Sequence, residues 1–429
     1  MRQPLRVFLT ILFLLPLVPC FTAQTLAQET SDFLQINGRV ADASGKPLHY
    51  ASVSLVGARV ANVTNADGEF SLKLDLRTSP SALVTISHLG YATVSLRVSE
   101  FAGHGPEDPL KIRLVPVSMT LSPALITGQN AEELLLAALY RIRQNYSEEF
   151  VGMTAFYREL IKKGNTKYLT MNEAILDIVK APYNSFQIDR VGIYKGRGSQ
   201  NYDSSDTLFI RYQGGALTMF DIDQAKHPFA TVGIQDVARC YDFRSEPSEF
   251  LGDRVFYVVS FNQKDGLEDI YMRGKVFIDS ESLAIGRVEM QMNVEGREDA
   301  VDLFVLKRPQ DTRFEVKSAE YVVNYRLHDD GKWYYDYGKA EVRFETRRKR
   351  SLFRNHYTVL SEIAVTDHKP APLPIDKDAR VKFRDQLTEK VSAFTDDNFW
   401  ENYNVIEPDA DIEAIIRRIV RQLKKHNFE

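Results

Sequence analysis

Hydrophobic and polar residues alternate along most of this chain, in runs separated by turn-forming residues. Between residues 33 and 116 the runs are short, and Gly, Asn and Asp interrupt them at close intervals. Alternation with a period of two puts every second side chain on one face of a strand, so this region predicts a small β-sandwich. From residue 150 to 370 the runs are longer and predict a larger antiparallel β domain. The fold class expected is mainly β.

Two stretches follow a helical period instead. Within residues 117–149, Asn130 precedes the run AEELLLAALY, whose two early glutamates suit the first turn of a linking helix. Residues 371–429 start as a proline-rich connector, and isoleucines then recur at helical spacing after Pro408. We therefore expect a helical C-terminal tail.

The stretch TNADGEF predicts a tight turn directly before a strand. The side chains of Asn65 and Asp67 can accept hydrogen bonds from the backbone that follows, and Gly68 can adopt a positive φ. Phe70 then begins the core-facing positions of the next strand. We interpret the motif as a turn that sets strand register and not as a binding site.

Gly90, next to Tyr91, predicts a second backbone irregularity with an aromatic residue beside it. Together the elements INGRV, GKPL, TNADGEF and HLGY resemble the carboxypeptidase regulatory-like domain. That family is a transthyretin-like β-sandwich, which also occurs at the start of many TonB-dependent outer-membrane transporters. Asn65 stands where the family usually has Asp, which weakens any cation-binding role for that position.

The remainder of the chain carries two further resemblances. FYRE and the later EA look like elements of exported Gram-negative proteins that carry this sandwich in front of a large domain of unknown function. VFID and LAIGRVEM look like strands of the half-barrel found in periplasmic lipoprotein carriers. These resemblances imply a half-barrel-like arrangement for the large domain and bring no established activity.

The N-terminus has the pattern of a secretory signal peptide. Two arginines precede an apolar run, and small residues lead up to Ala27, so we expect residues 1–27 to be removed. The mature protein is then exported, either to the periplasm or in association with the outer membrane. Cys20 raises the alternative of a lipoprotein, but Pro19 occupies a position where such a signal needs a small residue.

Composition excludes several classes of function. A formal charge of −4 argues against nucleic acid as a partner, because neutralising phosphates requires a basic face. Once Cys20 has left with the signal peptide, Cys240 is the single remaining cysteine, so neither a disulfide nor a cysteine-based zinc site is expected. We expect no metal and no cofactor.

Hydrolytic motifs are weak or missing in the sequence. His104 to Glu107 is a His-x-x-Glu pair of the kind found in zinc carboxypeptidases, and it falls in a Gly/Pro-rich loop. There is no Gly-x-Ser-x-Gly elbow, and Ser199 lies in the unrelated stretch GRGSQN. Asp265 and Glu268 could pair as carboxylates, but acidic loop residues are usually solvated. A hydrolase is the least favoured function.

Two surface motifs leave alternatives open. The basic run from Arg347 to Arg354 could meet anionic lipid headgroups or an acidic partner. The interpretation we favour is a solvated turn, with Leu352 and Phe353 packed inward. The aromatic run that starts at Trp333 could face a sugar or a lipid, but alternating aromatics on a strand more often form core pairs.

The function that the sequence favours is a non-enzymatic envelope protein. Its sandwich would be a docking or stabilising module, and the partner would be another envelope or outer-membrane protein. The alternative is a carrier or binding protein for a lipid or another apolar ligand in the large β domain. A carrier requires a continuous apolar cavity between sheet and helix, whereas a hydrolase requires histidines and acidic residues that converge in a cleft.

Overall fold

The structure is a computed structural model and describes residues 33–117, 130–164, 167–200, 215–229, 236–305, 310–349, 351–369, 374–382, 385, 387–392 and 399–426. The expected signal peptide, including Cys20, and parts of both connectors lie outside these residues. Over the described part the chain is mainly β, which confirms the predicted fold class. None of the described helices has the length and apolar character needed to cross a bilayer.

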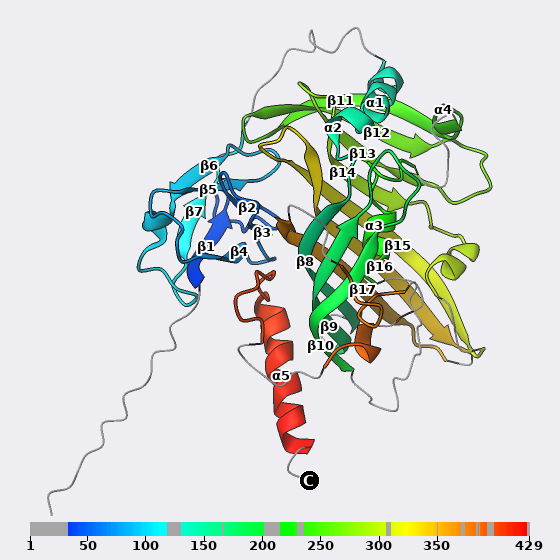
Figure 1. Cartoon of the computed structure of the whole chain (residues 1–429). Coiled ribbons are helices and arrows are strands. Elements are labelled where there is room, and N and C mark those ends of the chain that lie inside the picture. Colours follow the sequence, from blue (N-terminus) through cyan, green and yellow to red (C-terminus); the bar gives the residue numbers. More distant parts are fainter. Residues whose placement is uncertain are drawn as a thin grey trace, which may run out of the picture. The chain divides into compact units, whose positions relative to one another are not determined.

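Seven strands form the N-terminal sandwich (Figure 1). One sheet has the order β4-β1-β7 and the other the order β3-β2-β5-β6. The elements are β1 (Phe33–Ala41), β2 (Ser52–Leu55), β3 (Ala61–Val63), β4 (Glu69–Asp75), β5 (Leu83–Ser87), β6 (Val94–Arg97), η1 (Val98–Phe101) and β7 (Leu110–Arg113). Phe70 and Leu72 of β4 pack against Ile36 of β1 and Val53 of β2 in the core between the sheets.

Ten strands form one antiparallel sheet with the order β10-β9-β8-β17-β16-β15-β14-β13-β12-β11. Because β10 and β11 are its edge strands, the sheet is open and does not close into a barrel (Figure 1). The strands are β8 (Val151–Lys163), β9 (Lys167–Lys180), β10 (Arg190–Gln200), β11 (Tyr241–Leu251), β12 (Arg254–Gln263), β13 (Met272–Asp279), β14 (Ile285–Met292), β15 (Thr312–Leu327), β16 (Trp333–Arg348) and β17 (Asn355–Lys369).

The inner face of this sheet, defined as the face that carries Tyr157 and Tyr335, packs against short helices. Leu135 and Ala138 of α1 and Phe220 of α3 join the same apolar core as these two tyrosines. The predicted linking helix is thus present, with the Asn130 side chain accepting a hydrogen bond from the second residue of α1 at 3.2 Å. The short elements are α1 (Ala131–Tyr140), α2 (Ile142–Asn145), α3 (Thr218–Asp221), α4 (Val237–Cys240), η5 (Asp299–Leu303) and η6 (Leu387–Glu389).

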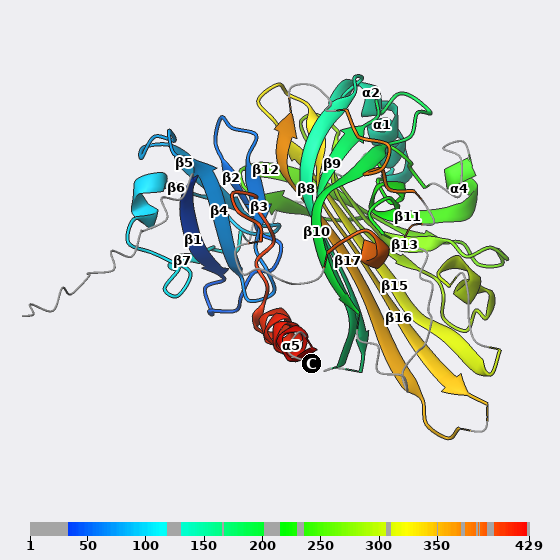
Figure 2. The ribbon, with the colours of Figure 1, turned by 60° about the horizontal axis from the view of Figure 1, so that its bottom comes forward.

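The outer face of the sheet, defined as the face that carries Phe156 and Tyr337, packs against the C-terminal tail. Val405 and Ile406 of the tail join these two side chains in a separate buried cluster. The predicted C-terminal helix is α5 (Ala410–His426), whose buried isoleucines pack on β8 and β9. Figure 2 shows α5 beside the ends of β8, β9 and β10.

Candidate functional site

The TNADGEF motif forms a turn between β3 and β4. The Asn65 side-chain oxygen accepts hydrogen bonds from the backbone of Asp67 at 3.0 Å and of Glu69 at 2.8 Å. Gly68 has a φ of +75°, and a Cβ there would lie 2.3 Å from the carbonyl oxygen of Val40. This position therefore needs glycine for both its conformation and its space.

The same turn also contacts the C-terminal tail, which the sequence did not indicate. The Asn65 side-chain nitrogen donates to the carbonyl of Pro408 at 3.2 Å. The Asp67 carboxylate accepts a hydrogen bond from the backbone of Ala410, the first residue of α5, at 2.9 Å. Asp67 thus acts as a cap for a helix far away in the sequence.

The motif formed by Gly90 and Tyr91 lies where the sandwich meets β11. Gly90 has a φ of +81°, and its N–H donates to the carbonyl of Phe250 at 2.6 Å. Tyr91, beside it, forms an isolated bridge with Pro116 and packs on the sandwich core. Both motifs therefore join the sandwich to the rest of the chain.

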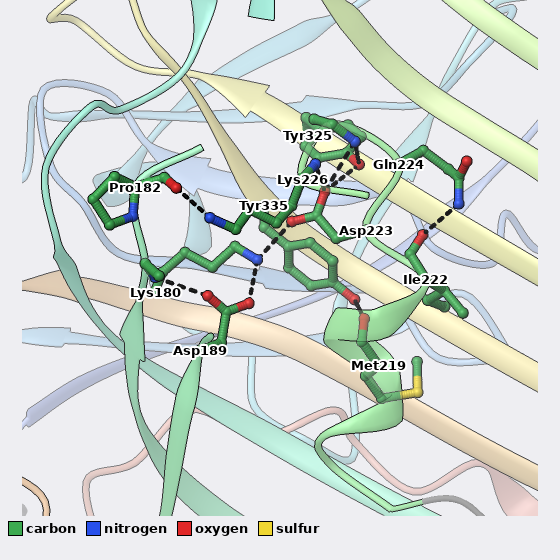
Figure 3. A network of polar contacts seen from close by, with 12 residues as sticks. Lys180, Pro182, Asp189, Met219, Ile222, Asp223, Gln224, Lys226, Tyr325 and Tyr335 are labelled. Atoms are coloured by element: carbon green, nitrogen blue, oxygen red, sulfur yellow. Dashed lines mark hydrogen bonds and ion pairs between the residues drawn. The ribbon is translucent and has the colours of Figure 1, made fainter. Parts of the chain in front are cut away.

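A buried ion cluster, the inner cluster, lies on the inner face of the sheet (Figure 3). Lys180 Nζ lies 2.5 Å from Asp189 Oδ2 and 2.7 Å from Asp223 Oδ2. Tyr325 donates to the other oxygen of Asp223 at 2.6 Å. The Lys180 side chain is 2% exposed, so the two carboxylates replace the water that would otherwise solvate its ammonium group.

The electrostatics of the inner cluster keep it ionised. Burial alone would lower the pKa of Lys180, but the Asp189 and Asp223 carboxylates outweigh burial and raise it. Burial would raise the pKa of Asp223, but Lys180 and the Tyr325 hydroxyl outweigh it and lower it. A lysine nucleophile needs a lowered pKa, so Lys180 is a structural ammonium.

A second cluster, the outer cluster, lies on the outer face. Arg158 Nη2 lies 2.8 Å from Glu173 Oε1, and Arg158 Nη1 lies 3.2 Å from Glu362 Oε1. Arg197 reaches the second oxygen of Glu173 at 2.9 Å. Arg158 Nη2 also donates to the carbonyl of Ile406 in the tail at 2.8 Å. This cluster is as buried as the inner one and equally closed to a substrate.

The accessible candidate site is a cavity of about 640 Å³ between the sandwich and the large sheet. This volume lies within the usual range of ligand pockets. On the sandwich side, Ser52 and Ser54 of β2 stand opposite Ser87 and Thr85 of β5 in the strand register. Val53 points into the sandwich core, so these four hydroxyl groups line the wall of the cavity.

A β-bulge shapes the opposite wall. Asn324 pairs with Tyr337 and Tyr325 pairs with Tyr335, so Asp336 is an extra residue in β16. The bulge turns Tyr335 to the inner face and Tyr337 to the outer face, although their spacing predicts a common face. Asp336 Oδ1 lies 2.9 Å from Arg326 Nη2, and both residues line the cavity.

The charges of the lining balance. Four arginines (Arg59, Arg254, Arg287, Arg326) and four aspartates (Asp253, Asp329, Asp330, Asp336) contribute to the wall. Some are already engaged, since Arg254 binds Asp279 at 2.6 Å. Arg59, by contrast, forms no ion pair with any residue that the structure describes. The cavity therefore offers donors and acceptors without a net charge.

Buried polar atoms at the cavity have unused hydrogen-bonding capacity. Trp333 is 2% exposed, and its Nε1 has no hydrogen-bond partner among the described residues. His328 Nε2 is unpartnered in the same sense, and its ring lies 4.5 Å from that of His368. Burial, with the nearby Arg326 charge, lowers the pKa of His328 to about 4. Burial and His328 lower the pKa of His368, so both rings are neutral at neutral pH.

The cavity brings imidazoles and carboxylates together, but not in a hydrolytic arrangement. Within the described ranges no hydroxyl or thiol donates a hydrogen bond to a histidine ring. His88 binds the backbone carbonyls of Leu89 and His49, and His104 binds the carbonyl of Asp108 in an exposed loop. Nowhere in the described part of the chain do three or more His, Cys, Asp or Glu side chains gather to hold a metal ion.

The expectation that Leu352 and Phe353 pack inward is wrong. Leu352 is 96% exposed and Phe353 is 82% exposed, at the turn between β16 and β17. By contrast, Trp333 and Tyr335 are buried, as expected for core aromatics. Apolar residues generally prefer the interior, but a hairpin turn extends beyond the part of the sheet that other elements cover. Its apolar side chains can therefore remain exposed.

Comparisons with known proteins give a family for one part of the chain. No curated protein matches the sequence. Among solved structures, the chain is similar to a LolA superfamily protein from Nitrosomonas europaea, with 11% identity, a TM-score of 0.22, and coverage of 57% of this chain and 96% of the other. It is also similar to a DUF1329 family protein from Desulfovibrio piger, with 13% identity, a TM-score of 0.22, and coverage of 55% and 94%.

Neither likeness is close enough to transfer a ligand or an activity. Residues 35–114, in contrast, match the carboxypeptidase regulatory-like domain family. This match agrees with the resemblance carried by INGRV, GKPL, TNADGEF and HLGY. The N-terminal sandwich of this protein is a carboxypeptidase regulatory-like domain.

Proposed function

We propose that this protein is a non-enzymatic binding protein of the cell envelope. It holds a small polar ligand without net charge in the cavity between the sandwich and the sheet. The sandwich is both a stabilising module and one wall of that cavity. The envelope location rests on the signal-peptide pattern of residues 1–27.

The observation that carries the proposal is the composition of the cavity wall. Equal numbers of arginines and aspartates, next to a row of hydroxyl groups, favour a neutral or zwitterionic ligand over a strongly charged one. Trp333 is also part of this wall, and its buried Nε1 has no hydrogen-bond partner among the described residues.

A carrier for a lipid or another apolar ligand is the second candidate, and it needs an apolar cavity between sheet and helices. Side chains of α1 and α3 pack directly on the described strands of the inner face, with Leu135 and Phe220 inside the main core. The cavity on the sandwich side has charged and hydroxyl groups among apolar side chains such as Leu55 and Leu251. These observations favour the polar ligand.

The non-enzymatic part of the proposal rests on the state of the reactive groups. Asp336 is held by Arg326, and Lys180 is held by two carboxylates. Burial raises the pKa of Asp336, although Arg326 opposes the shift. A perturbed carboxyl can mark a catalytic acid, but here no hydroxyl or thiol among the described residues donates a hydrogen bond to a histidine ring.

Native mass spectrometry of the full chain, purified from the envelope of its own cells, tests the proposal. We expect a bound small molecule that is released on denaturation. The variant Ser54→Phe, which fills the cavity from the sandwich wall, should lose it. Ser95→Phe is the matched control, because Ser95 is exposed on β6 and pairs with Thr85 but does not line the cavity.

Two outcomes would overturn the proposal. A wild-type protein that carries no bound molecule is one of them. A molecule that Ser54→Phe retains is the other, and an acyl-chain lipid retained in this way would favour the carrier.

A further inference from the structure

Two hairpins end side by side at one end of the large sheet. The β8–β9 hairpin and the β16–β17 hairpin are neighbours because β17 pairs with β8, with Tyr357 opposite Lys163. The backbone of Gly164 in the first turn donates to the carbonyl of His356 at 2.8 Å. Figure 2 shows the long strand β16 running toward this end of the sheet.

The turn of the β16–β17 hairpin exposes two large apolar side chains, Leu352 and Phe353. The turn has a defined local structure, because the Ser351 hydroxyl accepts a hydrogen bond from the Phe353 backbone at 3.1 Å and the Ser351 backbone donates to the Arg348 carbonyl at 3.0 Å. Exposing two adjacent side chains of this size to water is unfavourable unless another surface covers them.

Cations surround these two apolar side chains. Arg347, Arg348 and Lys349 are exposed and form no ion pair with any described residue. We call residues 347–349 and 351–354 the basic tip. Lys162 and Lys163 on the neighbouring hairpin add positive charge at the same end.

The acidic groups nearby are already engaged with other partners. Glu345 binds Arg354 at 2.7 Å, Glu315 binds Lys317, and Glu298 binds Arg313. Asp311 accepts from the Thr312 hydroxyl at 3.0 Å. The basic tip is therefore a local positive patch on a chain with a formal charge of −4.

We propose that the basic tip docks onto an anionic lipid bilayer. Leu352 and Phe353 enter the boundary between headgroups and acyl chains, while Arg347, Arg348 and Lys349 face the anionic headgroups. An anionic membrane has an apolar layer directly beneath a layer of negatively charged headgroups. The basic tip matches these two layers, with two apolar side chains for the first and three cations for the second.

The membrane contact is separate from the cavity. Trp333 begins β16 and lines the cavity, whereas Arg348 ends this 16-residue strand at the basic tip. A protein that docks in this way keeps its ligand cavity away from the bilayer surface. The inference goes beyond the proposed function and does not depend on the identity of the ligand.

Co-sedimentation of the full mature chain with vesicles of phosphatidylcholine and phosphatidylglycerol tests the proposal. The double variant Leu352→Ser/Phe353→Ser should bind about tenfold more weakly or worse, because it removes the apolar insertion. Phe186→Ser is the matched control and should bind as the wild type does. Phe186 is 107% exposed in the connection between β9 and β10, at the opposite end of β9 from the basic tip.

The electrostatic part is tested with Arg347→Glu/Lys349→Glu and with vesicles of phosphatidylcholine alone. Each change should reduce binding about tenfold, and added salt should weaken wild-type binding to the mixed vesicles. Thermal unfolding should be the same for all variants, because the replaced side chains are exposed. Equal wild-type binding to neutral and anionic vesicles, or no loss in the serine double variant, would overturn the proposal.

Discussion

The two buried ion clusters of the large sheet have similar burial but are connected to the chain in different ways. In the inner cluster, Lys180, Asp189 and Asp223 satisfy one another within the large sheet and its connections. In the outer cluster, Arg158 binds two glutamates on neighbouring strands and also the carbonyl of Ile406 in the tail. The ion pairs of the inner cluster therefore lie within the large sheet and its connections, whereas the outer cluster also binds the C-terminal tail.

That difference explains how the sandwich can act as a stabilising module. Asn62 of β3 donates to the carbonyl of Ser71 in the sandwich and to the carbonyl of Val405 in the tail, both at 2.8 Å. Val405 is adjacent to Ile406, which accepts from Arg158. A continuous set of buried hydrogen bonds thus leads from the sandwich through the tail to the outer cluster, with no counterpart described at the inner cluster.

The largest effect is expected from Asp223→Asn, which breaks the inner cluster. Removing one carboxylate leaves the buried Lys180 with Asp189 alone, so the free energy of unfolding should fall by about 3 kcal/mol. Urea unfolding at pH 7 measures this change. Asp221→Asn is the control, because Asp221 is exposed and should change stability little. Equal urea midpoints for the two variants would contradict the role of the inner cluster.

An intermediate effect is expected from Asn62→Ala, which interrupts the route to the outer cluster. Two buried carbonyl groups lose their donor, so the free energy of unfolding should fall by about 2 kcal/mol. Hydrogen exchange of the tail amides around Val405 should accelerate. Asn37→Ala is the control, because Asn37 is equally buried but accepts its bond from Gln35 within the sandwich. Unchanged exchange in the tail of Asn62→Ala would show that the route does not couple the two regions.

The smallest effect is expected from Glu362→Gln in the outer cluster. Burial raises the pKa of Glu362 despite Arg158, so a neutral amide is a closer substitute here than at Asp223, and the cost at pH 7 should be about 1 kcal/mol or less.

The pH dependence of Glu362→Gln gives a second readout. A raised pKa means that the folded wild type binds the proton more tightly than the unfolded chain. Wild-type stability relative to the variant should therefore fall as the pH rises above 4.5. Asp223 has a lowered pKa, so its contribution to the free energy of unfolding should instead be lost as the pH falls below 3.8. Urea unfolding across this range checks both signs, and a common sign for the two sites would contradict the comparison.

Features that depend on neighbouring residues were predictable from the sequence. Asn130 begins α1, and Gly68 takes the positive φ of its turn, because caps and turns use hydrogen bonds within a few residues. The mainly β fold follows from the same kind of local alternation. The family of the sandwich was visible because several such local elements occur in a fixed order.

The candidate site was not predictable, because it depends on the register between distant segments. The bulge at Asp336 places Tyr335 and Tyr337 on opposite faces of the sheet, and only the pairing of β16 with β15 defines it. No local pattern marks Arg326 or His328 as cavity residues, because the opposite wall comes from the sandwich. The exposure of Leu352 and Phe353 likewise depends on what lies above the hairpin and not on their own hydrophobicity.

The sequence by itself determined which segments become strands, turns and helices, because those preferences act over a few bonds along the backbone. Tertiary structure decided which buried charges meet, where the cavity opens and which apolar side chains stay in water. These outcomes depend on strand pairing and on the packing of one layer against another, and so on contacts between residues that are distant in the chain.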